Sequence, residues 1–370
     1  MLAASLLVIL GFAAQGSAQA QPLAGPSPWT VVPNPLASPG NNLLSSVASI
    51  SAGDVWAVGS ADDGNGNTQP LREHWNGSAW TIAAGPNNFD VLNGVAAAST
   101  DAVWAVGQRF GGAVIEHWNG HTWAQADNPA AGSGTTLNGV AALSSRDVWA
   151  VGTAAATGTA QTFIEHFNGH TWSVVPSPNA SARNNLLVAV AAVSASNVWA
   201  VGDFQNDQNV FRTLIEHWDG TAWRIVPSPS GAGVQAGLLS VAALSSTNVW
   251  AGGNSGAATL IEHWNGTRWT VVPSPTPPGT LSNPVGGLAP VSASDIWAVG
   301  QTQNGTTGSP STLIEHWNGT SWSLVASPSP GSQATLTGAA ADRSTGQAWA
   351  VGNFTDPVTG AQRTLTEFNP

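Results

Sequence analysis

One tetrapeptide, Trp-Ala-Val-Gly with a single variant, occurs seven times along this chain of 370 residues. Its tryptophans are Trp56, Trp104, Trp149, Trp199, Trp250, Trp297 and Trp349, at spacings of 45 to 52 residues. A period of this length is typical of domains built from repeated supersecondary units. The repeat therefore overrides the prior from chain length, which alone would suggest two or three domains.

Two further motifs accompany the tetrapeptide. The motif Glu-His-Trp-Asn-Gly, or a close variant, follows each copy, and its glutamates are Glu73, Glu116, Glu165, Glu216, Glu262, Glu315 and Glu367. Another tryptophan follows six of these motifs, at Trp80, Trp123, Trp172, Trp223, Trp269 and Trp322. The seventh lies at the other end of the chain as Trp29, in a segment that matches the surroundings of Trp269 almost letter for letter.

Each unit predicts four short strands, here called A to D in chain order. Examples are residues 137–143 for strand A, 148–151 for B, 214–218 for C and 223–226 for D. The Asn-Gly or Asp-Gly dipeptide between C and D is the strongest short signal for a hairpin. A proline ends strand D because it cannot continue a ladder.

Seven four-stranded units predict an all-β fold, a seven-bladed β-propeller with antiparallel blades. We expect the N-terminal strand at Trp29 to complete the last blade as its strand D. Such closure joins the two chain ends and protects the sheet edges there.

The motif order, Val-Trp-x-Val followed by His-Trp-Asn-Gly-x-x-Trp-x-x-Val-Pro, resembles tectonin-type lectin repeats. The chain as a whole resembles a secreted, Trp-rich β-propeller repeat protein of bacteria. It is also similar to the Asp-box repeats of sialidase-type and photosystem-assembly-factor propellers and, in period, to kelch repeats. The B–C loops are longer than in tectonins, and the full Asp-box and the paired kelch glycines are absent. The resemblance covers residues 28–370 and implies the fold, so a function taken from it is an analogy.

The N-terminal segment has the pattern of a secretory signal peptide. An apolar run at 6–14 precedes the small-residue triplet Ala18-Gln19-Ala20, which predicts cleavage after residue 20. The expected organisation is a signal peptide at 1–20, a linker at 21–27 and the propeller at 28–370. We therefore expect a secreted or cell-surface protein.

Composition narrows the classes of partner and chemistry. The formal net charge is −11 and the chain has no lysine, which argues against nucleic acid as a partner. No later stretch is apolar enough to insert into a membrane. Cysteine and tyrosine are absent, which removes thiolate metal sites and chemistry built on a thiol or phenol.

The repeated glutamates and histidines look like acid–base chemistry, but a structural role is the simpler expectation. Neighbours on a strand point to opposite faces, so Glu216 and His217 are expected in two different interfaces between blades. A catalytic centre needs one asymmetric constellation, whereas this pair recurs in six blades. Each carboxylate is expected to accept hydrogen bonds from an indole, hydroxyl or backbone N–H of a neighbouring blade.

The 19 tryptophans also fit repeat positions: seven in strand B, seven in strand D and five in strand C, where Phe167 and Phe368 replace the others. Those of strand D are expected to be the most exposed, because strand D is outermost. An alternative is that the repeated tryptophans serve as stacking platforms for sugars. The Asp or Asn before strand B, such as Asp54, is expected to form a turn.

Binding is expected where the blades differ. The A–B and C–D links are short and uniform, whereas the D–A and B–C segments are long and variable and emerge on one face, here called the long-loop face. The candidate ligand-binding residues there are Phe89, Arg109, Phe110, Phe204, Asp207, Phe211, Arg212, Phe354 and Arg363. Aromatic rings beside amides and guanidinium groups suit a sugar or a peptide; the alternative is that they pin loops.

A Ca²⁺ site is a further hypothesis, with Asp62, Asp63 and Asn65 as oxygen ligands; the alternative is a solvated turn, and no other cofactor is indicated. The sequence favours a secreted, non-catalytic module that binds glycans or surface proteins, without catalytic residues. The alternatives are a propeller hydrolase or lyase and a structural cell-surface scaffold.

Overall fold

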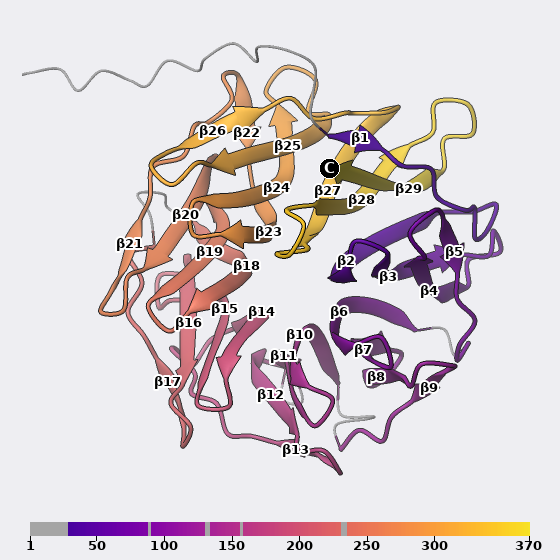
Figure 1. Cartoon of the computed structure of the whole chain (residues 1–370). Coiled ribbons are helices and arrows are strands. Elements are labelled where there is room, and N and C mark those ends of the chain that lie inside the picture. Colours follow the sequence, from indigo (N-terminus) through magenta and orange to yellow (C-terminus); the bar gives the residue numbers. More distant parts are fainter. Residues whose placement is uncertain (1–28, 88–89, 130–133, 156–157, 231–234) are drawn as a thin grey trace, which may run out of the picture.

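Seven β-sheets surround a central axis in the computed structural model (Figure 1). It describes residues 29–87, 90–129, 134–155, 158–230 and 235–370. Every sheet is antiparallel and has four strands, except that one carries an additional short strand, β22 (Thr280–Ser282). The predicted seven-bladed propeller is confirmed. The predicted signal peptide and linker lie outside the described residues.

The strands occupy equivalent places in blades 1 to 7. The A strands are β2 (Asn42–Ser51), β6 (Val91–Ser99), β10 (Thr135–Ser144), β14 (Asn185–Ser194), β18 (Ala236–Ser245), β23 (Val285–Ser292) and β27 (Ser332–Ala341). The B strands are β3 (Asp54–Asp62), β7 (Ala102–Arg109), β11 (Asp147–Ala154), β15 (Asn197–Gln205), β19 (Asn248–Ser255), β24 (Asp295–Asn304) and β28 (Ala348–Thr355). The C strands are β4 (Thr68–Trp75), β8 (Gly112–Trp118), β12 (Gln161–Phe167), β16 (Phe211–Trp218), β20 (Ala258–Trp264), β25 (Pro310–Trp317) and β29 (Gln362–Asn369). The D strands are β5 (Trp80–Ile82), β9 (Trp123–Gln125), β13 (Trp172–Val174), β17 (Trp223–Ile225), β21 (Trp269–Val271), β26 (Trp322–Val325) and, in blade 7, β1 (Thr30–Val31).

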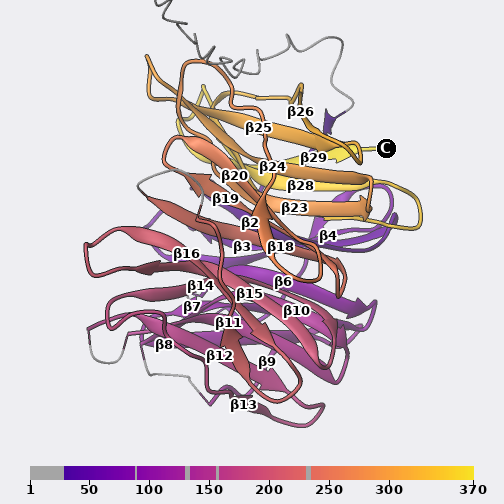
Figure 2. The same ribbon diagram turned by 90° about the vertical axis from the view of Figure 1, so that its left-hand side faces the viewer.

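The ring closes in blade 7, where β1 pairs antiparallel with β29 and Thr30 and Val31 lie opposite Phe368 and Glu367. The expected closure by the N-terminal strand is therefore confirmed. Figure 2, turned by 90°, shows the strands of the blades crossing the thickness of the ring. No helix of the described residues is long and apolar enough to cross a membrane.

The core lies between blades rather than within them. Each B-strand tryptophan meets the D-strand tryptophan of the next blade edge to face, with ring centroids 5.2 to 5.8 Å apart, as Trp56 meets Trp123. The D-strand tryptophans are therefore buried, at 1 to 8% exposure, and the expectation that they are the tryptophans likeliest to be partly exposed is wrong. They are covered because the chain leaving each blade passes over the next one.

Two other expectations about the repeat are also wrong. The register pairs Trp349 with Phe368, so Phe368 takes the histidine position and Asn369 the position of the strand C tryptophan. The A–B links are not uniform, because that of blade 7 runs from residue 342 to 347, whereas the others have two residues.

The A strands approach the axis closely at a β-bulge in every blade. The residue after the bulge is always small: Ser46, Gly94, Gly139, Ala189, Ser240, Gly287 and Gly338. A Cβ at Gly287 would lie 2.5 Å from the backbone N of Ala339 in the next blade. Close packing at the axis thus requires small residues. It leaves a central channel of about 230 Å³.

Candidate functional site

The repeated glutamates connect adjacent blades. All seven are fully buried. The fifth residue after a D-strand tryptophan donates a hydrogen bond to the glutamate of the next blade, as Ser177 Oγ does to Glu216 Oε2 over 2.8 Å. Equivalent pairs are Ser228–Glu262, Ser274–Glu315, Ser327–Glu367 and Asn34–Glu73. Hydroxyl donors from a neighbouring blade were predicted and are confirmed at four of these seams.

Burial leaves these carboxyl groups easily protonated. Desolvation raises the pKa of Glu73, Glu262 and Glu315 to about 7, although hydrogen bonds from the preceding blade act in the opposite direction. It raises the pKa of Glu216 and Glu367 to about 8. Perturbed pKa values often mark functional sites. Here they recur around the ring, which indicates a structural cause.

The seam between blades 1 and 2 departs from this pattern. Arg72 occupies the position before the glutamate, which is isoleucine in blades 2 to 6. Its Nε donates to Glu116 Oε2 over 2.6 Å, and both side chains are buried. The usual serine is replaced by Gly85, where a Cβ would lie 2.9 Å from Arg72 Cζ. Arg72 therefore takes the serine's place as the donor to Glu116, and Gly85 leaves the space that the guanidinium group needs.

The charged cluster continues toward the long-loop face. Arg109 Nη2 lies 3.2 Å from Oδ2 of Asp90, whose side chain is fully buried. Burial raises the pKa of Asp90 and of Glu116, while the nearby guanidinium groups lower both. Arg109, a predicted ligand-binding residue, thus has an ion-pair partner. Its neighbour Phe110 is fully exposed, and Phe89 lies outside the described residues.

The histidines and glutamates face different interfaces, as predicted. His217 packs against Trp199 of its own blade, with ring centroids 4.2 Å apart, and this tryptophan contacts the following blade. Glu216 contacts the preceding blade through Ser177.

The Asp or Asn that was expected to form a turn before strand B is instead the first residue of that strand in five blades, where it has a role that the sequence did not predict. Asp54 Oδ1 lies 2.9 Å from His74 Nε2, and the same contact joins His166 to Asp147, His217 to Asn197, His263 to Asn248 and His316 to Asp295. Blade 2 has Ala102 at this position, and blade 7 has Gln347 opposite a phenylalanine. Blade 2 keeps His117 although Ala102 removes its partner, so the change of both positions in blade 7 was the one signal in the sequence that could have revealed the pair.

Several predicted binding residues lie in strands rather than in loops, because the B and C strands are longer than expected. Phe204 is paired with Arg212, and Phe354 with Arg363. Phe204 and Phe354 are partly buried against the core, and Phe211 is half-buried at the start of β16. Asp207 is exposed in the turn between β15 and β16. These residues belong to blades 4 and 7 and form no single cluster with Phe110 of blade 2.

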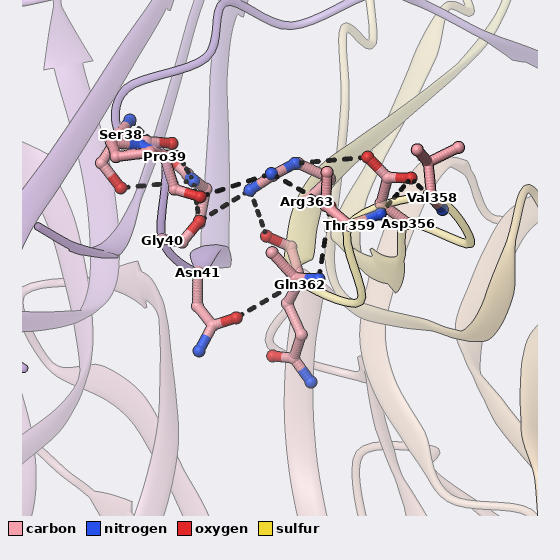
Figure 3. Close-up of polar contacts among 11 residues, drawn as sticks. Ser38, Pro39, Gly40, Asn41, Asp356, Val358, Thr359, Gln362 and Arg363 are labelled. Carbon is pink, nitrogen blue, oxygen red and sulfur yellow. Dashed lines mark hydrogen bonds and ion pairs between the residues drawn. The ribbon is translucent and has the colours of Figure 1, made fainter. Parts of the chain in front are cut away.

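Arg363 joins blade 7 to the segment that enters blade 1 (Figure 3). Its Nη1 donates to the carbonyl O of Gly40, and its Nη2 to that of Pro39 and to Thr359 Oγ1. The backbone N of Gln362 donates to Asn41 Oδ1. These contacts fasten the long-loop face beside the point of ring closure.

The proposed calcium ligands are engaged with their own loop. Asp62 Oδ1 accepts from the backbone N of Gly64, and Asp63 Oδ1 from those of Asn65 and Asn67. The Asn67 side chain also donates to Asp63 Oδ2 over 2.8 Å, and these hydrogen bonds lower the pKa of Asp63. Within the described ranges, no three His, Cys, Asp or Glu side chains form a group that could hold a metal ion.

Two further features are seen in the structure, and of the residues that form them only Phe110 was predicted from the sequence. Arg343, in the long A–B link of blade 7, donates to the carbonyl O of Pro290 in blade 6 and of Ala243 in blade 5. It therefore ties three blades together on the short-loop face. Exposed large apolar side chains lie either on D strands or in D–A and B–C segments: the latter are Leu36, Phe110, Leu281 and Val358.

Comparison with known proteins places the chain by fold alone. No family model and no curated protein matches the sequence. Solved structures are similar over most of the chain. YCF48 bound to D1 peptide has a TM-score of 0.60 and 15% identity, covering 94% of this chain and 99% of that one. U3-55K has a TM-score of 0.61 and 9% identity, covering 92% and 98%. A GH74 xyloglucanase from Xanthomonas campestris has a TM-score of 0.56 and 16% identity, covering 92% of this chain and 55% of that one.

Proposed function

We propose that this protein is a non-catalytic binding propeller that holds a protein partner on its long-loop face. The supporting observation is the position of the exposed apolar side chains. Apart from those on D strands, they lie in the D–A and B–C segments, and Phe110 and Val358 are 103% and 90% exposed. Aromatic side chains such as that of Phe110 are enriched at the centres of protein interfaces.

The similar propeller solved with a bound D1 peptide supports this assignment by analogy of fold. The predicted signal peptide would place the long-loop face outside the cell. Glycans, the other ligand class that the sequence suggests, are a less favourable fit to an isolated, fully exposed phenylalanine than to a hollow with polar walls.

The enzymatic alternative rests on the similarity to a xyloglucanase. Against it, the buried glutamates contact neighbouring blades, and the histidines pack on tryptophans of their own blades. A scaffold role would suit the uniform seams, but it gives no reason for a fully exposed phenylalanine in the B–C segment of blade 2.

A random peptide library displayed on phage, run in parallel with a glycan array and with and without Ca²⁺, tests the proposal. We expect peptides to be enriched and their binding to weaken at least tenfold in Phe110→Ser, as for an interface anchor. Ile82→Ser is the matched control, because Ile82 is also exposed but lies on the D strand of blade 1. Enrichment of glycans alone, or equal loss in both variants, contradicts the proposal.

A further inference from the structure

A groove of about 490 Å³ lies at the outer seam between blades 2 and 3. Its described lining comes from the segment that leaves blade 2 and from the C–D hairpin of blade 3: Ala126, Asp127, Asn128, Pro129, Phe167, His170, Thr171 and Trp172. This volume is within the range of small-molecule sites in proteins. None of these residues belongs to the predicted long-loop site, so the groove is a separate feature.

The groove coincides with departures from the repeat. Phe167 stands where five blades have a half-buried tryptophan, and the smaller ring leaves space at the seam. Asp127 stands where four blades have proline and two have alanine, and Ala126 where five have valine. Trp172, which borders the groove, is 8% exposed, whereas the other D-strand tryptophans are 1 to 5% exposed. Smaller and more polar residues therefore meet at one seam.

The groove has an aromatic floor and fixed polar walls. Phe167 is held between Trp104 and Trp172, with ring centroids 4.9 and 5.5 Å away. Asn168 Oδ1 accepts hydrogen bonds of 3.0 Å from the backbone N–H groups of His170 and Thr171, which sets the hairpin that forms one wall. Asp127 is exposed on the opposite wall. On the hairpin side of the groove, little loop ordering is then needed on binding.

We propose that this groove binds a neutral hexopyranose unit of a carbohydrate. One face of such a ring presents C–H groups that pack on an aromatic side chain. Its edge carries hydroxyl groups that donate to the Asp127 carboxylate and exchange hydrogen bonds with the His170 imidazole and the Thr171 hydroxyl. The described lining contains no Lys or Arg, and Asp127 repels anions, so a neutral sugar fits better than a uronate or sialate.

Titration of the full-length chain with methyl β-glucopyranoside, methyl β-galactopyranoside and methyl β-mannopyranoside, followed by ligand-observed NMR and calorimetry, tests this site. We expect at least one of them to bind, and methyl β-glucuronide to bind at least tenfold more weakly. Phe167→Trp restores the residue of five blades, fills the groove and should weaken binding more than tenfold. The absence of binding by all three neutral sugars, or stronger binding of the glucuronide, overturns the proposal.

The repeat supplies matched controls. His121 occupies in blade 2 the position of His170, but beside a tryptophan, Trp118. We expect His170→Thr to weaken binding several-fold and His121→Thr to leave it unchanged. Should Phe167→Trp fail to fold, Asp127→Ala is a second, independent test. Asp127 is exposed, so the substitution should leave the fold intact and weaken sugar binding. Equal affinity of wild type and Phe167→Trp, or equal effects of the two histidine substitutions, contradicts this site without affecting the peptide-binding proposal, which depends on Phe110.

Discussion

Single residues decide how each seam of the ring is joined, and the seam between blades 1 and 2 shows that a substitution at one position requires another. In four seams a serine hydroxyl donates to a buried glutamate, which needs little space. Arg72 brings a charge instead and fills the volume beside Gly85. A buried ion pair of this kind adds little to stability compared with well-packed apolar side chains. Loss of one partner, however, leaves the other charge buried and uncompensated, which is strongly destabilising.

Arg72→Ile, which introduces the residue of blades 2 to 6, is therefore expected to lower the free energy of unfolding by about 3–5 kcal/mol. Gly85→Ser alone should also destabilise, because its Cβ meets the guanidinium. The double substitution recreates the serine–glutamate seam and should recover most of the loss. Urea unfolding of the four proteins measures this coupling. Additive losses in the double variant would show that the two positions are independent.

At the scale of the element, the repeat predicted the strands well because each has a local signal. The tetrapeptide, the Asn-Gly turn and the terminal proline mark strands B, C and D, and the match between Trp29 and Trp269 predicted closure. The burial of the D-strand tryptophans had no local signal, because it depends on the chain that passes over the next blade. The groove at Phe167 likewise requires knowledge of which residues meet across a seam.

The strand β1 offers a direct test of closure. Trp29 is 1% exposed and meets Trp297 edge to face at 5.2 Å. Trp29→Ala should cost about 3–5 kcal/mol, as expected for truncation of a buried tryptophan. Trp223→Ala is the control, because Trp223 holds the same position in a blade formed by continuous chain. Similar losses in thermal or urea unfolding are expected; a near-neutral Trp29→Ala would mean that β1 does not hold the ring closed.

For the whole molecule, the buried carboxyl groups set the pH dependence of stability. Five glutamates have a pKa of about 7 to 8 in the folded protein and 4.5 as the ordinary value. Between these values the folded state binds more protons than the unfolded state, so stability falls as pH rises. Burial lowers the pKa of His117, His217 and His263. Below the ordinary histidine pKa of 6.5 these histidines therefore make stability rise with pH, which opposes the effect of the glutamates.

Between pH 6.5 and 8.5 the change in stability with pH therefore reports on the glutamates rather than on these histidines. We expect the free energy of unfolding to decrease across it, with each glutamate contributing at most about 1.4 kcal/mol per pH unit near its folded pKa. Glu216→Gln removes one titrating group and keeps an acceptor for Ser177, so its slope should be shallower than that of wild type. Asp219→Asn is the control, because the pKa of the exposed Asp219 is lowered and lies far below the window. Urea unfolding at several pH values gives the slopes. A wild-type stability that is constant or rises with pH in this range would show that the seam carboxylates are already ionised in the folded ring.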